Sequence, residues 1–107
     1  MKFTNGYWMT KPEFRMDFAT QCVRAEKGDG KLKLLAACKP VRGRGDVLNI
    51  AALQVTLSAP RKNIIRVQIT HFAGAADHGP HFETFGEPFE PGICIEQESA
   101  TLSSGEL

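Results

Sequence analysis

The sequence predicts an all-β fold, an antiparallel β-sandwich, on three observations. Apolar and polar residues alternate over several short segments, which is the pattern of strands with one buried face. Glycine and proline clusters separate these segments at close intervals. No internal repeat and no convincing helical period longer than ten residues interrupts them. The 107 residues therefore suit a single domain, and a sandwich is favoured over a closed barrel.

The first two predicted strands are Gln21–Lys27 and Lys31–Cys38. Between them, Gly28 and Gly30 flank an aspartate, and we expect these glycines to supply the positive φ angles of a tight turn. The apolar spacing of the second segment also fits one helix face. Its few residues before Pro40 are short for a helix, so the tight turn favours a strand.

The next two predicted strands carry the clearest alternation in the chain. The segment Val41–Asp46 is rich in arginine and glycine and is expected to be a loop. Ala51–Ser58 then alternates strictly, and we expect Pro60 to end it because proline cannot donate to a sheet ladder. After a short polar link, Ile64–Phe72 alternates again, which predicts a hairpin or a meander pair.

A long loop and a last strand complete the chain. Ala73–Pro91 holds several glycines and prolines and has no regular period, and loops of this length are often functional or bound to a partner. We predict a strand within Ile93–Leu102, followed by a turn at Ser103–Gly105. Glu106 and Leu107 would open a further strand, so we expect the sandwich to be incomplete at its C-terminal end.

Composition excludes several classes of function. Thirteen basic and twelve acidic residues give a net charge of +1, too balanced for a nucleic-acid surface or a charge-driven membrane contact. The first ten residues lack the apolar core of a signal peptide. The odd count of widely spaced cysteines, Cys22, Cys38 and Cys94, argues against a disulfide framework. We expect three reduced thiols in or near the core of a cytoplasmic protein.

The three histidines and the acidic residues are the groups that could carry chemistry. His71, His78 and His81 lie close together near Asp77, but their spacing matches no defined zinc pattern, so we predict neither a metal nor another cofactor. Five glutamates lie between residues 83 and 98 without the fixed frame that a glycosidase carboxylate pair needs: Glu83, Glu87, Glu90, Glu96 and Glu98. The tripeptide Arg44–Asp46 matches an integrin motif, and a solvated turn explains it better.

The strongest candidate site is the aromatic part of the long loop. Phe82, Phe85 and Phe89 could stack on sugar rings, or they could anchor the loop onto a neighbouring domain. Anchoring is the preferred interpretation. His71 and His81 would then support the base of the loop through hydrogen bonds.

Four segments resemble bacterial α-xylosidases of glycoside hydrolase family 31. Lys2–Met9 is similar to their K-x-x-x-G-x-W opening, and Val41–Gly45 to their V-R-x-R segment. Arg66–Gly74 resembles R-[IV]-x-[IV]-x-H-[FY]-x-G, and Gly79–Phe82 follows it as G-P-H-[FY]. The four matches occur in order over nearly the whole chain, and together they are more specific than any one alone.

The resemblance implies a fold and a role. Residues 1–107 would form the start of a galactose-mutarotase-like N-terminal β-sandwich, with the catalytic (β/α)₈ barrel beyond residue 107. The parent enzyme would release terminal α-linked xylose with retention, using two aspartates of that barrel. No catalytic residue is therefore assigned to this chain, and no activity is expected of it alone.

Three functional hypotheses follow. The preferred one is a non-catalytic domain whose partner is the rest of the parent enzyme or another subunit, with a second copy as a further partner. The alternative is a free-standing carbohydrate-binding β module. The third is a small metal-binding β protein that uses the histidines.

Overall fold

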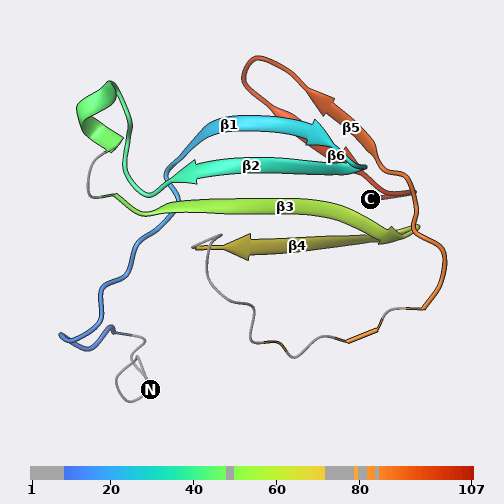
Figure 1. The fold of residues 1–107 in the computed structure, drawn as a ribbon, viewed down its shortest axis with the longest axis horizontal. Coiled ribbons are helices and arrows are strands. Elements are labelled where there is room, and N and C mark those ends of the chain that lie inside the picture. Colours follow the sequence, from blue (N-terminus) through green and yellow to red (C-terminus); the bar gives the residue numbers. More distant parts are fainter. Residues whose placement is uncertain (1–8, 48–49, 72–78, 80–81, 84) are drawn as a thin grey trace.

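The computed structural model describes residues 9–47, 50–71, 79, 82–83 and 85–107, with the side chains of residues 46 and 47 left out (Figure 1). The described strands form two antiparallel sheets, one with the order β1-β2-β3-β4 and one with β5-β6. The strands are β1 Gln21–Gly28, β2 Lys31–Ala37, β3 Ala52–Arg61, β4 Ile64–Thr70, β5 Gly92–Ile95 and β6 Ala100–Ser103. The all-β prediction is confirmed, and the arrangement of the sheets is sandwich-like.

The β1–β2 turn has the geometry that its sequence favours. Gly28 pairs with Lys31, so only two residues lie in the turn. Asp29 has a φ of 55° and Gly30 a φ of 66°. Two central residues with positive φ match the right-handed twist of the flanking strands. The positive angles thus fall on Asp29 and Gly30, and not on the two glycines as expected; aspartate tolerates this region better than most residues.

Strand β3 runs further than the sequence predicted. It continues through Pro60 to Arg61, so the expectation that Pro60 ends the strand is wrong. The β3–β4 register shifts between Ser58 and Arg61, which places the proline in a bulge. A bulged position has no ladder partner to satisfy, so the missing N–H of proline costs nothing there.

Two other segments differ from their predictions. The single strand expected over Ile93–Leu102 is a hairpin, because the chain reverses where the Glu96 N–H donates to the Ser99 carbonyl at 2.8 Å. The four residues of that turn are polar, and polar residues favour such reversals. Within the expected loop, Arg44–Val47 forms one short 3₁₀ turn. Among the described residues, no helix is long or apolar enough to cross a membrane.

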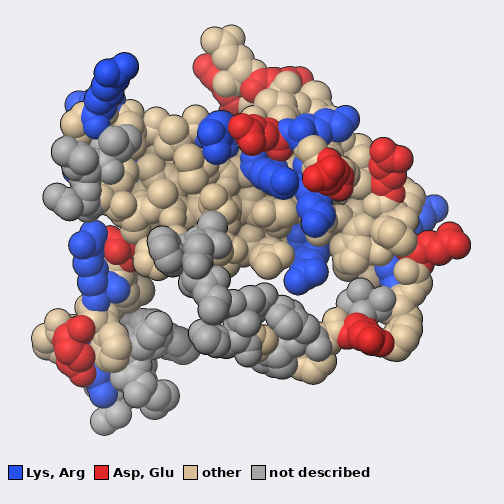
Figure 2. Space-filling view, in the orientation of Figure 1, with Lys and Arg blue, Asp and Glu red and all other residues tan. Residues whose placement is uncertain are grey.

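The four-stranded sheet has one charged face and one apolar face. In an antiparallel sheet, directly paired residues share a face. Figure 2 shows Lys, Arg, Asp and Glu side chains of both signs gathered on the face toward the viewer. The charged face carries Arg24, Glu26, Lys33, Thr56, Arg66 and Gln68 together with the apolar Leu35, and the apolar face carries Ala25, Leu32, Leu34, Val55, Leu57, Val67 and Ile69 together with Lys27 at its β1 end.

The core is small and lies to one side of the apolar face. Leu32 is fully buried, and Ala36 and Ala59 are also buried. The β5–β6 hairpin packs against β1, and Figure 1 shows it on the side of the main sheet away from β4. Its paired apolar residues Ile93 and Leu102 are half-buried. The second layer of the sandwich therefore covers only part of the first.

The three cysteines are free, but their expected position near the core is only partly correct. Cys22 and Cys94 are exposed, and Cys38 is half-buried. Cys94 pairs with Thr101 on the outer side of the small hairpin. Successive residues of a strand point to opposite faces, so Cys94 points away from the side on which its neighbour Ile93 is half-buried. This explains why Cys94 is exposed.

Candidate docking surface

The aromatic residues of the long loop divide into an anchored one and two exposed ones. Phe89 is half-buried, whereas Phe82 is 85% exposed and Phe85 is 75% exposed. Because an exposed phenylalanine side chain gains about 1.5–3 kcal/mol when it is fully buried, two such rings favour a partner surface. The first half of the loop lies outside the described residues, so the loop prediction is followed only from Phe82 onward.

Phe89 is anchored through the bulge in β3. Its N–H donates to the Ala59 carbonyl at 3.3 Å. The register shift leaves Ala59 without a Cα partner on β4, so its carbonyl is available to the loop. One irregularity in the sheet thus holds Phe89 in place, in a part of the loop (residues 85–91) that forms no strand.

A cleft of about 510 Å³ lies beside this anchor, between the β1–β2 turn and residues 88–91. Lys31, Ser58 and Arg66 share one cross-strand row on the charged face and line the cleft. Phe89 supplies an aromatic wall, with prolines on either side of its short segment. The cleft therefore combines one aromatic ring with polar and charged groups.

The loop also approaches the main sheet closely at Gly86. Its φ is 113°, a conformation that side chains rarely adopt. A Cβ at this position would lie 2.7 Å from Nε of Arg61. The backbone angle therefore favours glycine here, whereas the flexible Arg61 side chain could move to admit a methyl group. The loop passes close to Arg61, the last residue of β3.

The two histidines predicted to support the loop base are only partly described. His71 is exposed directly after β4 and lines a small cavity of about 210 Å³ with Arg15, Asp17 and Cys38. His81 lies outside the described residues. The supporting role of both histidines stays a prediction.

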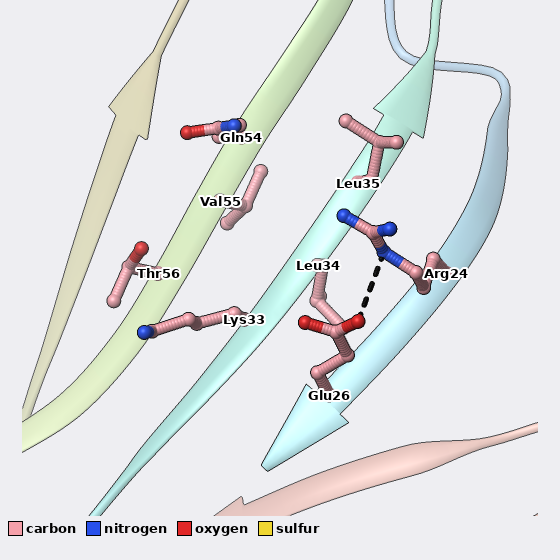
Figure 3. A pocket seen from close by; sticks show the side chains of 8 residues that line it. All are labelled: Arg24, Glu26, Lys33, Leu34, Leu35, Gln54, Val55 and Thr56. Atoms are coloured by element: carbon pink, nitrogen blue, oxygen red, sulfur yellow. Dashed lines mark ion pairs between the residues drawn. The ribbon is translucent and has the colours of Figure 1, made fainter. Parts of the chain in front are cut away.

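The charged face offers a second hollow, of about 280 Å³ (Figure 3). In it, Nε of Arg24 lies 3.2 Å from Oε1 of Glu26, and Lys33 reaches over the same hollow. Both members of the ion pair are more than half exposed, so the pair contributes little to stability. Glu26 is the one carboxylate lining this hollow, which therefore holds no carboxylate pair for glycoside hydrolysis.

Metal ligation finds no support in the part of the chain that the structure describes. There, no three His, Cys, Asp or Glu side chains are placed to hold one ion. His78 and Asp77 lie outside that part, as does His81. Glu96 and Glu98 are exposed, in agreement with their interpretation as solvent-facing residues.

The sequence of the chain is similar to those of known α-xylosidases. No family model matches the chain. An α-xylosidase, XylQ of Lactiplantibacillus pentosus, is 33% identical over 107 residues, which is 100% of this chain and 14% of that protein. An α-xylosidase of Emericella nidulans is 36% identical over 83 residues, which is 78% of this chain and 10% of that protein. The resemblance to α-xylosidases is confirmed, and the chain spans 10–14% of the length of these relatives.

Proposed function

We propose that this chain is a non-catalytic β domain region at the N-terminal side of an α-xylosidase-like glycoside hydrolase of family 31. The observation that carries the proposal is the extent of the match. Identity to one α-xylosidase covers the whole chain, yet it covers only 14% of that protein. The parent enzyme would remove terminal α-linked xylose from oligosaccharides, and its catalytic barrel would lie in the remaining polypeptide.

The role of the domain would be to pack against the rest of that enzyme. Phe82 and Phe85 hold two exposed rings outward, while Phe89 fixes the loop to the sheet. The prolines of the loop restrict its backbone, so less entropy is lost when it docks. The free thiols fit a reducing compartment, which supports a cytoplasmic location.

The proposal is tested by comparing the chain with the natural polypeptide. An antibody against residues 9–47 should detect a protein several times heavier than 11.8 kDa in the source cells. The heavy protein should hydrolyse an aryl α-xyloside, and the purified 107-residue chain should not exceed a no-protein control. Detection of an 11.8 kDa species alone, or turnover by the short chain, would reject the proposal.

The cleft beside Phe89 favours one alternative, a carbohydrate-binding module. An aromatic wall next to convergent polar groups is a common arrangement in small-ligand sites. Titration of xylose and xyloglucan oligosaccharides into the chain, followed by NMR, separates the two roles. We expect the signals of Phe82, Phe85 and Phe89 to stay unmoved, whereas saturable shifts of these signals would establish the module instead.

A further inference from the structure

Burial falls steadily across the apolar face of the main sheet. Leu32, Leu57 and Val67 form one cross-strand row on three adjacent strands. Leu32 is 0% exposed, Leu57 is half-buried, and Val67 is 57% exposed. In the neighbouring row, Val55 is half-buried and Ile69 on β4 is 61% exposed. One continuous apolar face is thus covered at β2 and open at β4.

The sequence of β4 is that of a strand with one buried face. Val67 and Ile69 alternate with Arg66, Gln68 and Thr70. β-branched residues in strict alternation favour a pleated strand packed on one side. The polar residues of β4 lie on the charged face of the sheet, as its register requires. Val67 and Ile69 are therefore exposed because nothing covers them, and not because the strand is out of register.

The covering layer stops next to this open area. β5 lies against β1, while the chain after β6 reaches β3, where Oγ of Ser104 donates to the Arg61 carbonyl at 3.0 Å. The hairpin therefore runs from the β1 side toward the middle of the sheet, with β6 inside (Figure 1). Among the described strands β6 pairs only with β5, so its other edge faces the uncovered half of the sheet.

We propose that a β-strand from the remaining polypeptide pairs with the free edge of β6 and covers Val67 and Ile69. This inference depends on the proposed function, because it takes its strand from the longer enzyme. The strand must alternate apolar and polar residues, with its apolar side toward Val55, Leu57, Val67 and Ile69. It extends the second layer of the sandwich over β3 and β4.

The test compares two neighbouring substitutions on β4 in two contexts. Val67→Glu places a charge on the proposed buried face, and Gln68→Glu places the same charge on the opposite face as a matched control. In the complete polypeptide, Val67→Glu should lower the first unfolding midpoint by about 3 °C or more relative to the control. In the 107-residue chain the two variants should unfold at midpoints within about 1 °C of each other.

Hydrogen exchange provides a second readout that needs no substitution. The amides of β6 that are not bonded to β5 should exchange at least about tenfold more slowly in the complete polypeptide than in the short chain. Equal exchange in both, or equal midpoints for the two variants in the complete polypeptide, would overturn the inference. A dimer of the short chain that Val67→Glu dissociates would also overturn it, because a second copy would then be the occupant.

The two proposals fail in different ways. If the source cells contain only the 11.8 kDa species, the proposed function itself fails. If they contain the large enzyme and Val67→Glu behaves like Gln68→Glu, only the strand addition fails.

Discussion

The two ends of the four-stranded sheet are built in opposite ways. At the turn end, where β1 meets β2 and β3 meets β4, the last residues of the chain bind the β3–β4 turn. The Glu106 N–H donates to Oδ1 of Asn63 at 2.7 Å, and the fully buried Ser104 bonds the Arg61 carbonyl. These partners lie 43 positions apart in the sequence, so they join the last residues to the middle of the chain.

At the opposite end, apolar side chains stand in solvent. The segment that leads into β1 exposes Phe14 by 39%, Met16 by 43% and Phe18 by 66%. These three alternate with Arg15 and Asp17, which bond each other at 2.9 Å and line a cavity shared with the sheet. The comparison shows that one end is closed by the chain itself, while the other presents apolar surface outward.

The largest expected effect tests whether stability resides near the turn end. Leu32→Ala should reduce the free energy of unfolding by about 2–5 kcal/mol, because it empties a fully buried position. Urea unfolding of the short chain measures it. Val67→Ala, in the same cross-strand row, is the control and should cost under about 1 kcal/mol. Similar losses for both variants would contradict the asymmetry of the core.

A smaller effect tests the closure by the last residues. Gly105 has a φ of 64°, and a Cβ there would meet the side chain of Asn63. Gly105→Ala should therefore cost about 2 kcal/mol, from backbone strain together with a weakened hydrogen bond. Gly43→Ala is the matched control, since nothing lies within 4 Å of its added methyl group. If thermal unfolding shows the same loss for both, the closure contributes nothing specific.

The smallest effect tests the exposed end. Phe18→Ser should change the free energy of unfolding of the short chain by less than about 0.5 kcal/mol, because the ring is mostly in water. Denaturant unfolding of the short chain and its variant measures the difference. A loss above about 1 kcal/mol would mean that the ring is buried in solution, and the contrast between the two ends would be weaker than the structure indicates.

Local pattern was enough to predict most of the strands. The alternation in Ala51–Ser58 and Ile64–Phe72 predicted β3 and β4 with their correct faces, because a two-residue period is a property of the strand alone. A turn after the last strand was also predicted, but it runs from Ser104 to Leu107 and not over Ser103–Gly105. The expectation that Glu106 and Leu107 open a further strand is wrong, because both residues belong to this turn. The hairpin in residues 93–102 was missed, since its strands are only four residues each.

The candidate site was less predictable, because it depends on contacts that no local pattern encodes. The phenylalanines were identified as a group, yet nothing in the sequence separates the anchored Phe89 from the exposed Phe82. That distinction comes from the Ala59 carbonyl, which accepts the hydrogen bond from Phe89. This carbonyl is available because the β3–β4 register shifts at Ala59 and Pro60. A proline inside an alternating run was the one available signal, and it indicates a bulge as well as a strand end.

The open edge of β4 has a consequence for the synthesis of the protein. An edge strand with exposed β-branched residues can template pairing with other chains, and such pairing leads to aggregation. In an enzyme as long as the relatives, a domain that is made early would wait on the order of a minute for the remainder. Arg66, in the middle of β4, and Lys62, in the turn that leads into β4, are both exposed and carry positive charge at this strand. Charges at these positions disfavour self-pairing, so they would protect the nascent domain while its final partner is still being made.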